Sequence, residues 1–232
     1  MTSNHKDYLS SRVTLNMGPS HPATHGTLRF TMELEGEKII KCVPEIGYLH
    51  RGFEKSAEKG TYSQVIPYTD RLNYCSAMIN NVGYVMAVER LMDIKITERC
   101  RYIRVIISEL SRIMDHLVCI GANAVDLGAL TNFWYFFRLR EDIYEVLESL
   151  CGSRLTTAYT RIGGLMRDAG EDFIPGVKCL IEEKIPAALK DVDSLLTRNK
   201  IFYDRTKNIG KISALDAAAY SLTGPCLRAS GV

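Results

Sequence analysis

Residues 97–120 read TERCRYIRVIISELSRIMDHLVCI, and this stretch decides the fold because it predicts one long amphipathic helix. Its apolar residues recur at three- and four-residue spacings, the period of one helix face. Thr97, followed by Glu98, supplies an N-cap signal. Glu109 and Arg112 lie three residues apart and are spaced to pair on the exposed side. The apolar stripe consists of Ile103, Ile106, Ile107, Leu110, Ile113, Met114, Leu117 and Ile120.

Helical periodicity continues on both sides of this stretch. After Pro67, apolar residues repeat at helical spacing as far as Met92, with Tyr74 in the first turns. Residues 133–150 begin with an aromatic cluster typical of a core or a protein interface, and Gly152 ends that helix. Residues 175–196 predict an amphipathic helix that Pro186 bends, with residues 182–184 on its solvent side. Residues 213–222 predict a short Ala-rich helix.

The first sixty residues follow the two-residue period of strands instead. Residues 27–34 alternate, Glu35-Gly36-Glu37-Lys38 supplies a turn, and residues 39–43 resume as an apolar run, with residues 13–15 as a third strand. The predicted fold class is therefore α+β, a small N-terminal antiparallel sheet followed by a mainly helical bundle. We expect residues 1–60 to form the sheet region and residues 61–232 a helical domain that is incomplete at its C-terminal end.

Composition narrows the class of protein. The formal net charge is +2, from 29 Lys and Arg against 27 Asp and Glu, so no basic patch indicates a nucleic-acid partner. No run of 18 apolar residues predicts a membrane span, and residues 1–12 lack the apolar segment of a secretory signal.

The seven cysteines are widely spaced and include no CxxC pair, so neither a disulfide framework nor a zinc or iron–sulfur site built by this chain alone is expected. We expect most of them to be buried as small apolar residues.

The sharpest functional signal is Gly18-Pro19-Ser20-His21-Pro22-Ala23-Thr24-His25-Gly26, here called the histidine loop. Pro19 and Pro22 remove backbone donors, and Pro22 favours an extended conformation at His21, so no helix presents both histidines on one face. This excludes an HExxH metal site. A stiff loop that directs imidazoles at a ligand and a tight turn with solvated histidines both remain open.

Two other positions carry candidate chemistry. His50 and Arg51 lie beside glycines in Gly47-Tyr48-Leu49-His50-Arg51-Gly52, at the expected start of a short helix, where a solvated basic helix end is the alternative. Asp126 follows small and apolar residues, and a carboxylate in apolar surroundings needs a partner or a shifted pKa. The alternative for Asp126 is a helix-end cap.

Several blocks together resemble the quinone-site subunit of respiratory complex I, called the 49-kDa or D-type subunit, which is related to nickel–iron hydrogenase large subunits. The resemblance runs in order from about Val13 to the end of the chain. The blocks that carry it are the histidine loop, Gly47-Tyr48-Leu49-His50-Arg51-Gly52, Asp70-Arg71-Leu72-Asn73-Tyr74, Asp126-Leu127-Gly128-Ala129, Gly152-Ser153-Arg154, Arg161-Ile162-Gly163-Gly164, Thr223-Gly224-Pro225 and Arg228-Ala229-Ser230-Gly231.

The resemblance implies a role for particular residues. His25 and Tyr74 would hydrogen-bond the quinone headgroup, and Asp126 would hold His25 and raise its pKa. The chemistry agrees, because two-electron reduction of a quinone needs a proton donor at each oxygen, and imidazole and phenol both donate at neutral pH. His21 would shape the loop or relay protons.

The resemblance also implies partners. Arg51 and Arg71 resemble arginines near a 4Fe–4S cluster that belongs to a neighbouring subunit, where positive charge favours the reduced cluster. The expected protein is a subunit of a proton-pumping NADH:quinone oxidoreductase that forms one wall of the quinone chamber and is active only when assembled. The expected partners are the iron–sulfur subunit, other peripheral-arm subunits and the membrane-embedded quinone-channel subunit. The expected location is the cytoplasmic face of a bacterial inner membrane, or the matrix or stromal side of an organelle membrane.

The chain departs from the family at one position that bears on this chemistry. Many members carry a histidine, associated with pH-coupled tuning of the neighbouring cluster, where this chain has Thr156. Because threonine does not titrate, we expect a lower cluster potential that depends less on pH. Relatives also continue beyond the equivalent of Val232, so we expect a fragment or one half of a split subunit.

Three rival interpretations remain. A nickel–iron hydrogenase large subunit would carry RxCGxC near residues 71–76, where this chain has only Cys75. A non-catalytic assembly scaffold would have the same helices but would tolerate replacement of His25 and Tyr74. A metal site formed by His21, His25 and Asp126 is the third.

Overall fold

The computed structural model describes residues 12–232. The expectation that residues 1–12 contain no secretory signal therefore falls almost wholly outside the described residues. The chain divides into two compact units, with the boundary between Tyr68 and Thr69. Each unit has its own internal contacts.

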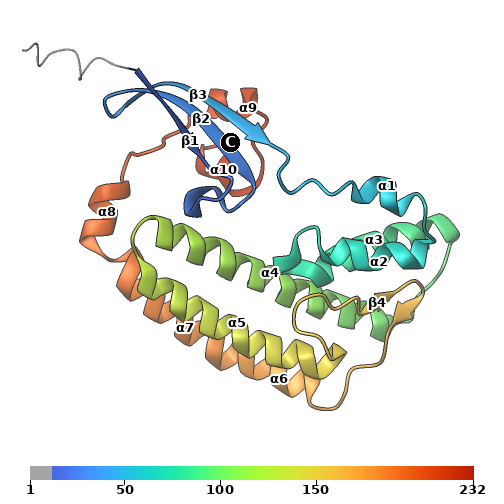
Figure 1. Ribbon diagram of the computed structural model, residues 1–232. Helices are drawn as coiled ribbons and strands as arrows, with labels where there is room; N and C mark the ends of the chain where they lie inside the picture. Colours follow the sequence, from blue (N-terminus) through green and yellow to red (C-terminus); the bar gives the residue numbers. More distant parts are fainter. Residues whose placement is uncertain (1–11) are drawn as a thin grey trace, which may run out of the picture. The chain divides into compact units, whose positions relative to one another are not determined.

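The first unit is built on a three-stranded antiparallel sheet, drawn in blue in Figure 1. Strands β1 (Arg12–Met17), β2 (Leu28–Glu35) and β3 (Lys38–Ile46) pair in chain order, with Val13 opposite Leu34 and Leu28 opposite Ile46. Only two residues separate β2 from β3, and the first of them, Gly36, has a φ of 61°. A glycine with positive φ is what such a tight hairpin turn requires. All three predicted strands are confirmed.

The helices after the sheet differ from the prediction in one respect. α1 (Phe53–Ala57) follows the Gly47–Gly52 block as expected, but α2 (Tyr62–Asp70) already contains Pro67, whereas helical periodicity was expected only after this proline. The missing donor of Pro67 leaves only the Ser63 carbonyl without its helical partner, and Ser63 is exposed to water. Tyr74 accordingly lies in the 3-10 helix η2 (Tyr74–Ser76), and α3 (Ala77–Met92) begins after it.

Two long helices form the centre of the second unit, α4 (Glu98–Asp126) and α5 (Leu130–Cys151). They are joined by three residues and lie side by side in Figure 1. The predicted N-cap is confirmed, because the Thr97 hydroxyl oxygen accepts a hydrogen bond from the Cys100 amide at 3.3 Å. The predicted stop at Gly152 is also confirmed, with a φ of 78°. The core contains Ile107, Leu110, Ile143, Leu147 and Leu150, each at most 2% exposed.

The segment predicted as one bent helix is continuous but irregular. It consists of α6 (Phe173–Cys179), the π-helix η3 (Leu180–Lys184), α7 (Ile185–Val192) and the π-helix η4 (Asp193–Thr197). Pro186 has no amide donor for the Glu182 carbonyl, which agrees with a wider turn immediately before it. The remaining elements of the second unit are β4 (Thr160–Arg161), β5 (Gly164–Leu165), α8 (Lys200–Thr206), α9 (Ala214–Ala219) and α10 (Gly224–Ala229).

The expectation for the cysteines is wrong. Only Cys100 and Cys151 are buried, while Cys42, Cys119 and Cys226 are exposed. The exposed thiols lie on a strand or helix face that the rest of the chain leaves uncovered. Among residues 12–232, no helix combines the length and the apolar character needed to cross a membrane.

Candidate functional site

The histidine loop connects β1 to β2 in the first unit and is organised around Thr24. Thr24 is 2% exposed, and its hydroxyl lies 3.2 Å from the Pro19 carbonyl and 3.1 Å from the His21 carbonyl. Its own carbonyl accepts hydrogen bonds from the amide and the hydroxyl of Thr27, at 3.0 and 2.9 Å. The loop is therefore fixed from within by the one side chain that it buries.

His21 and His25 occupy different places in this loop. Nδ1 of His21 accepts a hydrogen bond from the Ala23 amide at 3.1 Å and caps the 3-10 helix η1 (Pro22–Thr24). Nδ1 of His21 therefore acts as the acceptor that closes this short turn. His25 ends the turn in the left-handed conformation, with a φ of 51°, and its side chain is exposed. His21 thus shapes the loop, while the imidazole of His25 is presented to the outside of this unit.

Gly18 allows the loop to close. A Cβ atom at this position would lie 2.5 Å from the Leu28 carbonyl oxygen and 2.7 Å from Oγ1 of Thr24, and the φ of Gly18 is 93°. No other residue type fits both requirements. Gly26, at the other end, has a φ of 75° but open space around it.

Arg51 also belongs to the first unit and is exposed. Its guanidinium carbon lies 5.9 Å from the centroid of the Tyr68 ring, within the range of a cation–π contact. This contact holds the side chain without neutralising its charge.

Tyr74 lies in the second unit on a turn held by its neighbours. The Asn73 side-chain amide donates to Oδ1 of Asp115 on α4 at 3.1 Å, and the Asn73 carbonyl accepts from the Asn80 side chain at 2.9 Å. Tyr74 itself is 55% exposed. Among the described residues its hydroxyl has no hydrogen-bond partner, so a rigid turn presents an available phenol.

Asp126 is the last residue of α4, and its side chain is exposed. Its sequence neighbours Val125 and Leu127 are themselves 37% and 51% exposed, so they do not enclose the carboxylate. No hydrogen bond or ion pair to another described residue involves the Asp126 carboxylate. Asn73, the residue before Tyr74, contacts α4 at Asp115, eleven residues before Asp126. Asp115 and Asp126 therefore lie about 16 Å apart along the helix axis.

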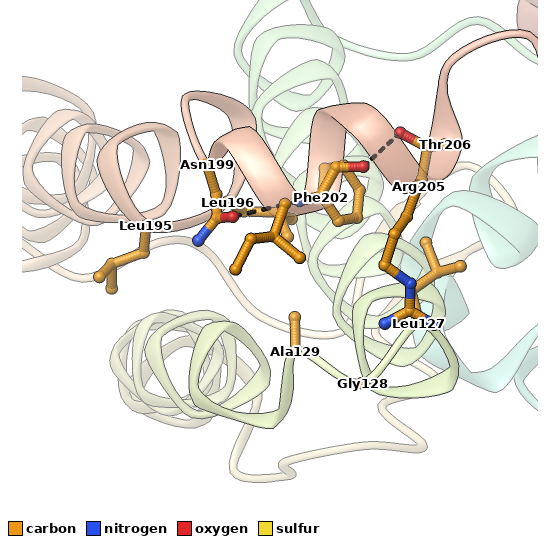
Figure 2. A pocket seen from close by; sticks show the side chains of 10 residues that line it. Leu127, Gly128, Ala129, Leu195, Leu196, Asn199, Phe202, Arg205 and Thr206 are labelled. Atoms are coloured by element: carbon orange, nitrogen blue, oxygen red, sulfur yellow. Dashed lines mark hydrogen bonds between the residues drawn. The ribbon is translucent and has the colours of Figure 1, made fainter.

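The residues directly after Asp126 in the chain line a pocket of about 240 Å³ (Figure 2). The turn between α4 and α5 contributes Leu127, Gly128 and Ala129, and the segment around α8 faces it. Asn199 and Thr206 use their side chains within this segment, accepting from the Phe202 amide at 3.1 Å and donating to the Phe202 carbonyl at 2.8 Å. The pocket is therefore mainly apolar, with the exposed guanidinium of Arg205 among its polar groups.

Two buried acidic residues were not identified from the sequence, and Asp70 is the first. It is fully buried, Oδ2 accepts a hydrogen bond from the Ala158 amide at 2.9 Å, and Oδ1 has no partner among the described residues. Burial raises the pKa of Asp70 despite the hydrogen bonds and the positive charges of Arg71 and Arg161. The only sequence signal was its position in the Asp70–Tyr74 block.

Glu89 is the second, and it pairs with Arg104. The two side chains form a bidentate ion pair, with both N–O distances at 2.7 Å and exposed fractions of 7% and 3%. Arg104 also donates to the carbonyls of Arg161 and Gly164, and Glu89 accepts from the Gly163 amide. Burial alone would raise the pKa of Glu89, but these hydrogen bonds and the charge of Arg104 lower it below its ordinary value. The pair fixes the turn between β4 and β5.

The candidate residues are divided between the two units. His21, His25 and Arg51 belong to the first, whereas Arg71, Tyr74 and Asp126 belong to the second. The contact between His25 and Asp126 therefore stays a prediction. Within the described part of the chain, no group of three or more His, Cys, Asp or Glu side chains is arranged to hold a metal ion.

Comparison with known proteins gives a consistent result. A family model described as the 49 Kd subunit of respiratory-chain NADH dehydrogenase matches residues 126–232. The chain is 54% identical over 220 residues to the C/D-type subunit of NADH-quinone oxidoreductase from Bdellovibrio bacteriovorus, which covers 95% of this chain and 39% of that protein. It is 52% identical to the D-type subunits from Myxococcus xanthus and Desulforamulus reducens, covering 96% and 94% of this chain and 54% and 59% of theirs. The chain thus spans about half the length of the curated relatives it matches.

Proposed function

Because the chain belongs to the family of the 49-kDa subunit of respiratory NADH dehydrogenase, we propose that it forms one wall of the quinone-reduction chamber of complex I. The observation that carries the proposal is the presentation of Tyr74. Its phenol is exposed on a turn that Asn73 fixes to α4, and it has no hydrogen-bond partner among the described residues. Such a group is positioned to donate to a ligand.

The chemistry requires a second donor, and His25 supplies it. Reduction of a quinone by two electrons places negative charge on two oxygens, and each must receive a proton. In the assembled site, Tyr74 donates to one oxygen and His25 to the other. Asp126 accepts a hydrogen bond from the His25 imidazole, which orients it and favours its protonated form.

The electrons come from a partner. A 4Fe–4S cluster in the neighbouring iron–sulfur subunit would supply these electrons, and the exposed charges of Arg51 and Arg71 would favour its reduced form. The chain works only within the assembled complex, where other peripheral-arm subunits and the membrane-embedded quinone-channel subunit complete the chamber. It binds as a peripheral subunit on the cytoplasmic face of the bacterial inner membrane, or on the corresponding side of an organelle membrane.

The proposal is tested by replacing the two donors in the assembled complex. His25→Ala and Tyr74→Phe are expected to reduce quinone reductase activity by about 10²-fold or more, the usual contribution of a positioned proton donor. Electron transfer from NADH to a water-soluble acceptor upstream of the quinone site should be unchanged.

Matched controls are available on the same chain. His116→Ala and Tyr220→Phe change an exposed histidine and an exposed tyrosine outside the candidate site, and they should leave quinone reduction unchanged. Unchanged turnover in both His25→Ala and Tyr74→Phe would identify the chain as an assembly scaffold and overturn the quinone-site proposal.

A further inference from the structure

A groove of about 480 Å³ runs between α3 and α4 in the second unit, and its lining includes none of the residues proposed to act on the quinone. We call it the α3/α4 groove. Residues of the connection between the two helices, Ile94 and Ile96, close one end. Its volume falls within the roughly 300–1,000 Å³ of established binding pockets. Most of its lining is apolar, and nothing in the proposed function uses it.

The floor of the groove is rigid. Val82, 7% exposed, and the Glu89–Arg104 ion pair line it, and two guanidinium nitrogens of Arg104 are each hydrogen-bonded to a carboxylate oxygen of Glu89. The pair also holds the Arg161 and Gly164 carbonyls. The floor therefore offers a fixed shape and no free charge, which is the condition for a preformed apolar binding surface.

The walls expose large apolar side chains from both helices. Met86 on α3 is 56% exposed and Val105 on α4 is 55% exposed, although both line the groove. Methionine adapts its unbranched side chain to an incoming partner. An occupant that inserts apolar side chains between Met86 and Val105 would remove both from water.

The rim is positively charged. Arg90 and Arg101 line the groove and are exposed, and neither forms an ion pair with a described residue. Glu109, the acidic residue of the rim, is paired with Arg112 through an Nε–Oε2 distance of 3.0 Å. Its charge is therefore already compensated, and the uncompensated charge around the groove is that of two guanidinium groups.

We propose that the α3/α4 groove binds an amphipathic helix of another subunit of the complex, with apolar residues three and four positions apart and carboxylates on both flanks. The apolar residues enter between Met86 and Val105, and the carboxylates pair with Arg90 and Arg101. A positive rim disfavours basic helices, so charge selects the partner and the apolar groove supplies the contact area. The proposal rests on membership of an assembled complex, but not on the role of His25 or Tyr74.

Site-specific cross-linking in the purified complex tests this contact. A photoreactive benzoylphenylalanine replaces Met86 or Val105, both exposed positions that tolerate a larger side chain, and adducts are mapped by mass spectrometry. The expected result is an adduct from both positions to one acidic, apolar segment of another subunit. The same probe at Leu189, an exposed apolar residue on α7, should form no adduct with that segment.

Charge variants make the test specific. Arg90→Glu with Arg101→Glu is expected to lower the adduct yield about fivefold, because two rim ion pairs become repulsive. Arg90→Lys with Arg101→Lys keeps the charge and should retain most of the yield. Adducts confined to the same polypeptide, adducts to a segment without carboxylates, or no adduct from either position would overturn the proposal. None of these readouts depends on quinone reduction, so the two proposals fail independently.

Discussion

The Glu89–Arg104 ion pair is buried on both sides, so neither residue tolerates the loss of the other. Arg104→Leu leaves the Glu89 carboxylate buried with only the Gly163 amide, and we expect a loss of about 3–5 kcal/mol in the free energy of unfolding. The double variant Glu89→Leu with Arg104→Leu should lose less, because no unpaired charge remains. Chemical denaturation of the single and double variants measures the difference, and equal losses would contradict it.

The lowered pKa of Glu89 fixes the direction of its pH dependence. A carboxyl whose pKa is lower when folded stabilises the protein fully above its ordinary value of 4.5. That stabilisation is lost as the pH falls below 4.5 through the lowered value. As the pH falls below 4.5, the free energy of unfolding of the wild type should therefore decrease relative to that of the double variant.

The pKa of Asp70 is shifted in the opposite direction to that of Glu89. Its pKa is raised by burial, so ionisation at neutral pH costs stability, and that cost disappears as the pH falls through the raised value towards 3.8. We expect Asp70→Asn, which keeps an acceptor for the Ala158 amide, to be as stable as the wild type or more stable at pH 7.

Asp70→Leu is the matched control for this prediction. It removes the acceptor and leaves the partly buried Ala158 amide without this partner, at a cost of about 1–3 kcal/mol. Denaturation curves at pH 7 and pH 5 separate the two effects. A loss for Asp70→Asn as large as that for Asp70→Leu would show that the charge itself is needed.

At the scale of elements, the histidine loop depends on the close approach at Gly18. Gly18→Ala brings a Cβ atom within 2.5 Å of the Leu28 carbonyl and also requires a positive φ. Gly26→Ala requires only the positive φ, which costs about 1–2 kcal/mol. We expect Gly18→Ala to reduce stability clearly more than Gly26→Ala in thermal denaturation, and similar losses would show that the loop relaxes around the new atom.

The sequence allowed most of the helices and strands to be predicted, because their apolar periodicity and caps are local. The three strands, the Thr97 cap and the stop at Gly152 all follow from neighbouring residues. Helix α2 was missed because proline usually ends a helix. Here Pro67 leaves only one carbonyl without its helical hydrogen bond, that of the exposed residue Ser63. Glu89 and Arg104 were missed because their contact spans fifteen residues and joins two helices.

At the scale of the whole molecule, the residues of the proposed site are divided between the two units of the chain. The histidine loop and Arg51 lie in one, and Tyr74 and Asp126 in the other. Sequence patterns predict which polar side chains each unit exposes, and His25 and Tyr74 are both exposed. The distance between the donors depends on the packing of the units and the other subunits, which no local pattern encodes.

Thr156 provides a prediction for the assembled complex. The segment that carries it is fixed on its C-terminal side, because the Asp70 carboxylate accepts a hydrogen bond from the Ala158 amide and the Tyr159 hydroxyl donates to the Arg167 carbonyl at 2.8 Å. Burial raises the pKa of Tyr159 to about 12. A new side chain at position 156 should therefore change the local charge without moving the segment. In the proposed site this charge lies close enough to the neighbouring 4Fe–4S cluster to affect its potential.

Threonine does not titrate near neutral pH, so the cluster potential of the wild type should change little between pH 6 and pH 8. Thr156→His introduces an imidazole with a pKa near 6.5, and reduction of the cluster raises that pKa by adding negative charge beside it. The potential should then fall with rising pH, with a slope that approaches but does not exceed about 59 mV per pH unit for one electron and one proton. Redox titrations of the cluster by electron paramagnetic resonance at several pH values measure this slope, with Thr156→Gln as the control that adds size without a titrating group. A steep slope in the wild type, or the same slope in both variants, would contradict a role for this position in tuning the cluster.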